Sequence, residues 1–387
     1  MAQRELTGIT WNHTRGLLPL LATAQRFMDA RPDVTIRWER RSLQAFADFP
    51  IERLAESFDL IVIDHPFAGH AGARPVLVPL DAHLPAEFLA DQAANSVGAS
   101  YRSYEAGGHL WALPIDAATP VAAWREDLLA RHGRGVPRTW DDLLDLARAG
   151  LVALPAIPID SLMAFFMLGN AFGEDPCATG ERVLGPEPGR QALEALRELV
   201  RCCDPACLDR NPIRTYEAMV ASDDIAYCPF AYGYSTYARP DYTAPRPPLR
   251  FGDLVELNGA RLRSTLGGTG LAITRRCADL ALAADYAAYC ASPEVQRGLW
   301  VATGGQPGHR AAWLDPEADR LTGGYHADTL RALDEAWLRP RHHGYIPFQD
   351  EAGHVVHAYL REGGDPLSVL DDLDRLYRQS LPGGPRA

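Results

Sequence analysis

The sequence predicts an α/β fold in two domains. The first observation is the order of elements in residues 1–66, where hydrophobic periodicity indicates β-α-β-α-β. The second is the length of 387 residues, which at roughly 100–200 residues per domain favours two domains. The third is a Pro-containing stretch over 107–133, which is suited to carrying the chain from one lobe into another.

The opening elements follow from this periodicity. Residues 6–11 alternate as in a short strand, and residues 17–33 place apolar side chains at helical spacing. A second strand is predicted over 34–42 and a polar helix over 51–58. The run 59–66 is apolar and ends in polar residues, as is typical of a buried parallel strand. This order is that of an α/β sheet.

The later elements are predicted in the same way. A helix over 137–150 has Thr139 as its N-cap and acidic residues in its first turn. Two further helices are expected over 161–173 and 189–203. A strand leading into an aromatic loop is expected over 223–240, and a strand crossing a glycine cluster over 261–277. A helix pair broken at Ser292-Pro293 is expected over 281–305.

Composition excludes several classes of protein. The net charge of -12 and the scattered arginines argue against a nucleic-acid partner. The chain contains no lysine, which excludes a pyridoxal Schiff base and a Walker A loop, and we expect no cofactor. No apolar run is long enough to span a membrane, and no secretory signal is visible. The seven cysteines form an odd set, unlike a disulfide framework. We expect a cytoplasmic location as written, or a periplasmic or extracellular one if a leader was removed.

Three segments, in this order, resemble the extracellular solute-binding proteins of ABC transporters, in particular the sugar-binding family 1. They are 107–144, which looks like the crossover between lobes, 266–277, which looks like the return strand, and 286–316, which looks like the helix pair and the turn after it. The resemblance covers most of the chain.

The resemblance implies a two-lobed periplasmic-binding-protein-like fold of type II, with discontinuous lobes joined by crossover strands. One lobe would comprise residues 1–113 with 265–312, and the other residues 114–264 with 313–387. A small-molecule ligand would bind in the cleft between the lobes, which would close by a hinge motion. The implied partners are this ligand and, if the chain is exported, ABC permease subunits.

One set of candidate ligand contacts follows the first and third predicted strands. Ligands of open α/β sheets bind beyond the carboxyl ends of strands, close to helix N-termini. The structural alternative for these residues is that the tryptophan belongs to the core and the first histidine to an ordinary loop. The candidates are Trp11, Asn12, His13 and Arg15 after the first strand, and Asp64 and His65 after the third.

A second set lies on the crossover, in the aromatic loop and in the glycine cluster. Aromatic faces and carboxylates suit a polar ring, and glycines allow a close backbone approach. The alternative roles are packing at a hinge and packing between lobes. These candidates are Trp111, Asp116, Tyr232, Tyr234, Gly268 and Thr269.

Two functions remain open from the sequence. The first is binding of a sugar, a polyol or a small organic acid, for which Arg15 would accommodate a carboxylate. The second is a cytoplasmic enzyme on the same fold, with His13 or His65 as acid or base and Asp64 or Asp116 as its partner. A metal site at His354 and His357 is not favoured, because the spacing lacks the HExxH pattern.

Overall fold

The computed structural model describes residues 3–42 and 51–383. The chain folds into two compact units: unit 1 is Met1–Ala118 with Gly267–Leu330, and unit 2 is Thr119–Leu266 with Arg331–Ala387. Both units are discontinuous and contain helices and strands, so the prediction of a two-lobed α/β protein is confirmed. The chain passes between the units at 118/119, 266/267 and 330/331.

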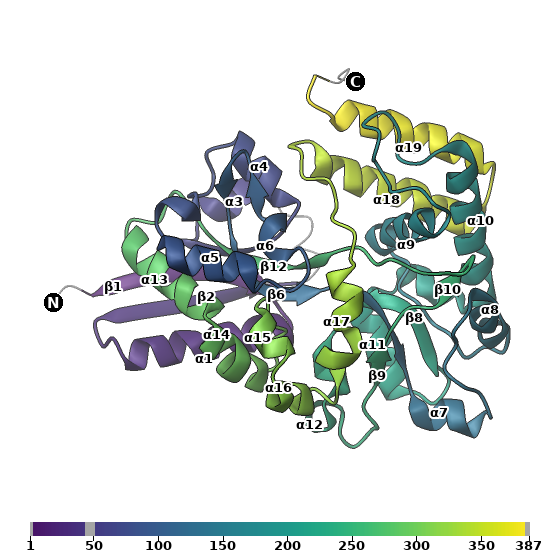
Figure 1. Cartoon of the computed structure of the whole chain (residues 1–387), viewed down its shortest axis with the longest axis horizontal. Helices are drawn as coiled ribbons and strands as arrows, with labels where there is room; N and C mark the ends of the chain where they lie inside the picture. Colours follow the sequence, from purple (N-terminus) through teal and green to yellow (C-terminus); the bar gives the residue numbers. More distant parts are fainter. Residues whose placement is uncertain (1–2, 43–50, 384–387) are drawn as a thin grey trace. The chain divides into compact units, whose positions relative to one another are not determined.

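The centre of unit 1 is a five-stranded sheet in the order β2-β1-β3-β12-β6 (Figure 1). Strand β1 pairs in parallel with β2 and β3, whereas β12 runs antiparallel to both β3 and β6. Residues 60–63 of β3 are all buried, as expected for a central strand with both faces covered. The strands are β1 (Arg4–Trp11), β2 (Val34–Arg41), β3 (Leu60–Asp64), β6 (Leu113–Ala118) and β12 (Gly267–Ile273).

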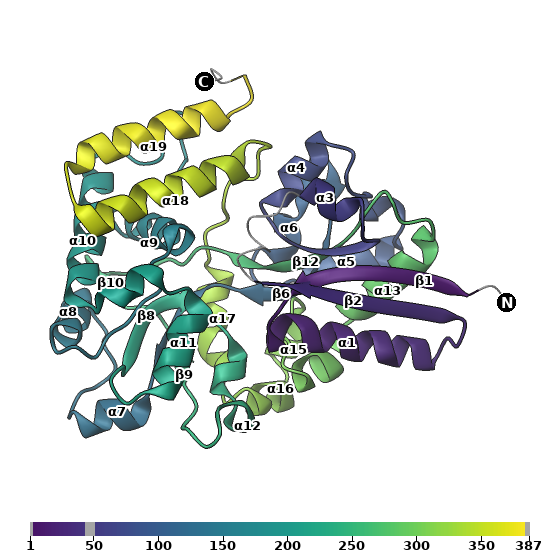
Figure 2. The same ribbon diagram turned by 180° about the vertical axis from the view of Figure 1, so that it is seen from behind.

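Helices cover both faces of this sheet. Helices α1 (Thr14–Asp29) and α13 (Leu280–Ala291) pack on the strands and on each other, with the rings of Phe27 and Tyr286 5.3 Å apart. Figures 1 and 2 show α3 (Ile51–Ala55), α4 (Phe67–Ala73) and α6 (Ser100–Ser103) on the side of the sheet away from α1. The buried apolar side chains of these elements form one core within unit 1.

Shorter elements complete unit 1. Two of them, β4 and β5, form a hairpin, and the helix pair predicted around Ser292-Pro293 is present as α13 and α14. The remaining elements are η1 (Leu80–Ala82), α5 (Ala86–Ala94), β4 (Glu105–Ala106), β5 (His109–Leu110), α14 (Pro293–Val295), η4 (Gln296–Trp300), α15 (Arg310–Trp313), α16 (Pro316–Leu321) and α17 (Tyr325–Asp334).

The two units differ from the predicted lobes mainly over residues 313–330. The sequence assigned this segment to the second lobe, whereas in the structure it belongs to unit 1. Trp313 explains the difference, because its Nε1 donates to Pro307 O at 2.7 Å. Its ring also packs on Tyr325 and His326, at centroid distances of 6.0 and 4.8 Å.

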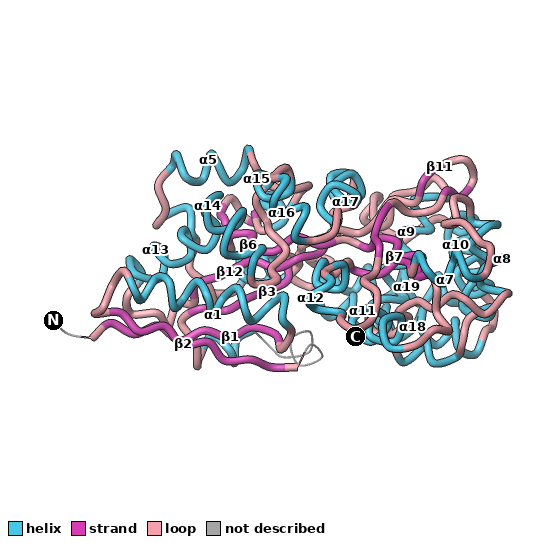
Figure 3. Tube along the Cα trace, turned by 90° about the horizontal axis from the view of Figure 1, so that it is seen from below, coloured by secondary structure: helices cyan, strands magenta, loops and turns pink. Residues whose placement is uncertain are grey.

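Unit 2 has a three-stranded sheet in the order β8-β7-β9 and is rich in helices, which Figure 3 shows in cyan. Helix α18 packs along both α9 and α19, and α10 packs on α9 and α19 (Figure 2). Their buried side chains make a second core, separate from that of unit 1. The principal elements are β7 (Pro120–Trp124), β8 (Tyr227–Tyr232), β9 (Arg250–Gly252), α9 (Pro158–Ala171), α10 (Pro186–Cys202), α18 (Tyr345–Glu362) and α19 (Pro366–Ser380).

The predicted cap at Thr139 is present. Helix α8 (Trp140–Arg148) begins after Thr139, whose side chain accepts a hydrogen bond from the backbone N–H of Asp142, and the Asp142 carboxylate accepts one in return. No helix among the described residues is long and apolar enough to cross a lipid bilayer. The other elements of unit 2 are α7 (Glu126–Arg131), η2 (Pro205–Asp209), α11 (Pro212–Ala221), η3 (Ser235–Ala238), α12 (Pro240–Thr243), β10 (Glu256–Leu257) and β11 (Ala260–Arg261).

Candidate functional site

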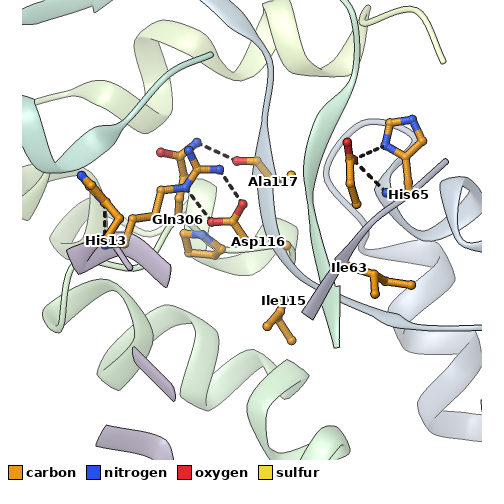
Figure 4. Close-up of polar contacts among 12 residues, drawn as sticks. His13, Ile63, His65, Ile115, Asp116, Ala117 and Gln306 are labelled. Atoms are coloured by element: carbon orange, nitrogen blue, oxygen red, sulfur yellow. Dashed lines mark hydrogen bonds and ion pairs between the residues drawn. The ribbon is translucent and has the colours of Figure 1, made fainter. Parts of the chain in front are cut away.

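One edge of the unit 1 sheet collects most of the predicted residues. Strands β1, β3 and β6 end there, and β12 begins there because it runs in the opposite direction. Thr269 of β12 therefore pairs with Asp64 on one side and with Asp116 on the other. The polar residues that follow these strands therefore lie along one edge of the sheet, in two groups that contain His13 and His65 (Figure 4).

Arg15 and Asp116 form a buried ion pair at this edge. Nε and Nη2 of Arg15 donate to the two carboxylate oxygens of Asp116 at 2.7 and 2.5 Å. The two side chains are only 4% and 1% exposed. Burial raises the pKa of Asp116, and the guanidinium of Arg15 opposes that shift. The charge of Arg15 is neutralised by Asp116, so Arg15 is not available to bind the carboxylate of a ligand.

His13 has a structural role at the start of α1. It is the N-cap residue, and its Nδ1 accepts a hydrogen bond from the backbone N–H of Arg15 at 3.1 Å. Burial, together with the charge of Arg15, lowers the pKa of His13 to about 3. The imidazole is therefore neutral near pH 7 and is a poor general acid. Asn12 beside it is exposed.

Both predicted tryptophans are part of the core. Trp11 is 3% exposed, and a Cβ on Gly16 would lie 2.3 Å from its ring, so the glycine makes room for the indole. Trp111 is 6% exposed, and its Nε1 donates to Ala106 O at 2.9 Å. For Trp11 the structural alternative, a core position, describes the observed position, and Trp111 also lies in the core of unit 1.

Asp64 and His65 lie at the end of β3. The carboxylate of Asp64 accepts a hydrogen bond from the backbone N–H of His65 at 2.8 Å and lies 3.3 Å from its Nδ1. Figure 4 shows His65 on the opposite side of the view from His13. The imidazole of His65 is buried, whereas the Asp64 side chain is 29% exposed. Asp64 is thus the more accessible of the two.

Gly268 and Thr269 bring the backbones of β12 and β6 close together. Gly268 has a φ of +96°, and a Cβ there would lie 2.4 Å from the carbonyl oxygen of Asp116. Only glycine fits both conditions. Thr269 is 8% exposed, and among the described residues its Oγ1 has no hydrogen-bond partner.

The two predicted tyrosines lie in unit 2, in different surroundings. Tyr234 is 6% exposed and packs with Tyr216 and Tyr237 at centroid distances of 6.3 and 6.4 Å, so it belongs to an aromatic cluster. Tyr232, at the end of β8, is half-buried, and its hydroxyl lies 3.0 Å from Thr265 Oγ1.

Sequence reasoning missed a small hollow in unit 2 that Tyr232 helps to line. It encloses about 10 Å³, which is roughly the space that one water molecule or one hydroxyl group needs. Its walls are mostly apolar, and the one charged group on them is Asp160. The lining residues are Pro120, Pro155, Asp160, Met163, Ala164, Met167, Phe230, Ala231 and Tyr232.

Asp160 is the most unusual group of this hollow. It stands in the first turn of α9 and is 7% exposed, and no described residue donates a hydrogen bond to its Oδ2. Burial alone raises its pKa to about 8. The sequence did contain a signal, since Asp160 is the single charged residue in the apolar run from 151 to 173. A buried carboxyl without a partner is costly to folding and typical of a functional site.

Comparison with known proteins identifies the family. A model of the bacterial extracellular solute-binding proteins matches residues 22–321, which is most of the chain. The chain belongs to this family. Solute-binding proteins of known structure also share its fold. One is the maltose-bound MalE3 of T. maritima, which has a TM-score of 0.85 at 18% sequence identity. The match covers 97% of this chain and 100% of the MalE3 chain.

Two further relatives carry polyols in their names. A solute-binding protein of Agrobacterium radiobacter K84 in complex with ribitol has a TM-score of 0.81 at 18% identity, covering 96% of this chain and 98% of its own. The mannitol-binding protein of Pseudomonas aeruginosa is 30% identical over 128 residues. That match spans 31% of this solute-binding protein and 28% of the relative, so it is partial.

Proposed function

We propose that this chain binds a neutral, hydroxyl-rich small molecule of the sugar or polyol class outside the cytoplasm and presents it to the permease of an ABC transporter. Family membership supports a solute-binding role, and the polyols and sugars in the relatives' names support the ligand class. Closure of the two lobes over the ligand, which the resemblance implies, stays a prediction.

The observation that carries the ligand class is the unpartnered carboxyl of Asp160. A carboxylate oxygen accepts hydrogen bonds, and a ligand hydroxyl is a donor of the size that the hollow takes. Apolar walls of Met163, Met167 and Phe230 suit the C–H faces of a sugar or polyol. A ligand hydroxyl that reaches Asp160 would therefore satisfy a buried carboxyl oxygen that no described residue of unit 2 satisfies.

The same observations disfavour a small organic acid. Above pH 8 a ligand carboxylate would meet the ionised carboxylate of Asp160 in unit 2, and in unit 1 it would find Arg15 already neutralised by Asp116. At the unit 1 edge, the partly exposed Asp64 and the exposed Asn12 carry polar groups of a kind that suits ligand hydroxyls. The enzyme alternative is not favoured, because the chain belongs to a family of solute-binding proteins and His13 is a neutral helix cap.

The test is calorimetric titration with matched neutral and acidic ligands at pH 9, where Asp160, with its pKa of about 8, is mainly ionised. Ribitol, D-mannitol and maltose form the neutral set, and gluconate, the carboxylate related to a hexitol, is the acidic counterpart. We expect at least one neutral ligand to bind and gluconate not to bind. Asp160→Asn should weaken the binding by about 10–100-fold, as expected for loss of a hydrogen bond to a charged group.

The matched control for this substitution is Asp374→Asn. Asp374 is also a partly buried carboxyl of unit 2, and burial raises its pKa. Unlike Asp160, it accepts a hydrogen bond from the backbone N–H of Val183 and does not line the hollow. This control should keep the wild-type affinity. Tight binding of gluconate, or an unchanged affinity in Asp160→Asn, would contradict the proposal.

A further inference from the structure

Four cysteines of unit 2 gather where α10 ends. Cys202 is the last residue of α10, Cys203 follows it, Cys207 lies in η2, and Cys228 lies in β8. All four are free thiols in the structure. Cys207 belongs to the buried core of unit 2, and Cys202 and Cys203 pack against that core.

The backbone between Cys203 and Cys207 makes a tight turn. The N–H of Cys207 donates to Asp204 O at 2.9 Å, and the Asp204 side chain accepts from the N–H of Ala206 at 2.8 Å. At the helix end, the N–H of Cys203 donates to Val200 O at 3.1 Å. The chain thus folds back on itself, so that Cys207 is fully buried in the core against which Cys203 packs.

This cluster does not have the arrangement of a metal site. Over residues 3–42 and 51–383, no group of three or more His, Cys, Asp or Glu side chains is placed to hold a metal ion. Two thiols at the ends of a short turn suit a different chemistry, because they need little chain movement to reach each other.

We propose that Cys203 and Cys207 form an intramolecular disulfide when the chain folds in an oxidising compartment. With glutathione disulfide as the oxidant, one cysteine thiolate attacks a glutathione sulfur and releases one glutathione thiolate. The second cysteine thiolate then displaces the other glutathione and closes the Cys203–Cys207 bond. The two cysteines lose two protons and two electrons, and the oxidant is reduced to two molecules of glutathione.

The burial of these thiols determines when the bond forms. Burial raises the pKa of both thiols, that of Cys207 to about 11, so the reactive thiolates are scarce in the folded protein. Oxidation therefore takes place while the chain is folding, and in the folded protein the bond is protected from exchange. Its occurrence in the cell rests on the export proposed above, whereas its formation in solution does not.

The bond would also restrain the start of α9. The carbonyl of Cys207 accepts a hydrogen bond from the N–H of Ala156 at 3.0 Å, and the carbonyl of Ala156 accepts one from Ser161 Oγ at 2.8 Å. Asp160 is the residue before Ser161 in this first turn. A disulfide at Cys207 would thus hold the backbone that positions Asp160.

The experiment is refolding of the full chain from the reduced, denatured state in a glutathione redox buffer, followed by tryptic peptide mapping. Residues 202–210 lie between two arginine cleavage sites, so one peptide contains Cys202, Cys203 and Cys207. We expect this peptide to lose the mass of two hydrogen atoms after oxidative refolding. The oxidised protein should melt about 2–5 °C higher than the reduced one, as expected for a short loop in a large chain.

Three single variants assign the bond. Cys202→Ser should keep the mass loss, whereas Cys203→Ser and Cys207→Ser should abolish it. Cys277→Ser, in unit 1, is the control for a remote buried thiol and should behave as the wild type. Because no ligand enters this assay, its result is independent of the proposed sugar or polyol binding.

Three outcomes would overturn the proposal. The first is a peptide that keeps all its thiols after oxidative refolding of a protein that has regained its native circular dichroism. The second is loss of the bond in Cys202→Ser, which would assign the pair to Cys202. The third is a cross-link between the 202–210 peptide and the peptide that contains Cys228.

Discussion

Two aspartates, Asp116 in unit 1 and Asp160 in unit 2, carry carboxyl groups that are almost wholly buried, at 2% and 7% exposed. Asp116 receives two hydrogen bonds from Arg15. Asp160 has no cation beside it and no donor to its Oδ2 among the described residues. The same functional group therefore stabilises the fold in one unit and is left unsatisfied in the other. The difference supports the proposal that Asp160, and not Asp116, contacts the ligand.

The largest effect is expected from breaking the satisfied pair. Arg15→Met removes the cation but keeps an apolar stem, and it leaves the Asp116 carboxylate buried and alone. We expect the free energy of unfolding in urea to fall by about 3–5 kcal/mol. The double variant with Asp116→Leu should recover most of this loss, because neither charge then remains buried.

An exposed ion pair provides the control for this prediction. Arg190 pairs with Glu187 on the surface of α10, at 2.7 Å. Arg190→Met should cost less than about 1 kcal/mol. If Arg15→Met costs as little as Arg190→Met, the buried pair does not stabilise the fold. Asp116 would then not differ from Asp160 in the way proposed.

A smaller effect is expected at Gly268, where β12 approaches β6. Gly268→Ala introduces a Cβ 2.4 Å from Asp116 O at a positive φ, so we expect the unfolding free energy to fall by about 3 kcal/mol. Gly298→Ala, in open space and with an ordinary φ, should be close to neutral. Equal melting temperatures for the two variants would show that β12 and β6 can move apart at Gly268 without loss of stability.

The smallest effect is expected at Tyr232, in the wall of the hollow. Tyr232→Phe keeps the ring but loses the hydroxyl that lies 3.0 Å from Thr265 Oγ1. We expect a loss of about 1 kcal/mol in unfolding free energy, the usual contribution of one hydrogen bond. Ligand affinity should change much less than in Asp160→Asn. If affinity falls as far as in Asp160→Asn, Tyr232 binds the ligand directly through its hydroxyl.

The sequence predicted the elements of the fold well because local signals define them. Alternation and helical spacing indicated β1, α1 and β3, the capping residues Thr139 and Asp142 indicated the start of α8, and Ser292-Pro293 indicated the break after α13. Each of these signals lies within a few residues of the feature that it predicts.

The pairing and burial of polar groups were not predictable in this way. Arg15 and Asp116 are 101 residues apart, so no local pattern shows that they neutralise each other. Whether Tyr234 is a loop residue or part of a core cluster depends on Tyr216 and Tyr237, which only the fold brings near. Asp160 stood out in an apolar run, but the lack of a partner is a property of the folded unit.

The most direct test of the account is the melting temperature of the wild type and Asp160→Asn at pH 8, without and with the neutral ligand found by titration. A carboxyl whose folded pKa of about 8 exceeds its unfolded pKa of roughly 4 holds its proton longer in the folded state. Folding stability is then lost as pH rises from 4 to 8. At pH 8 the ligand-free variant should melt several degrees above the wild type.

The ligand should narrow this difference, because it satisfies the carboxylate only in the wild type. The wild type should gain much more from ligand than Asp160→Asn gains, in proportion to its higher affinity. A ligand-free variant that melts below the wild type, together with an equal gain from ligand in both proteins, would contradict the account. Asp160 would then be a structural residue like Asp116.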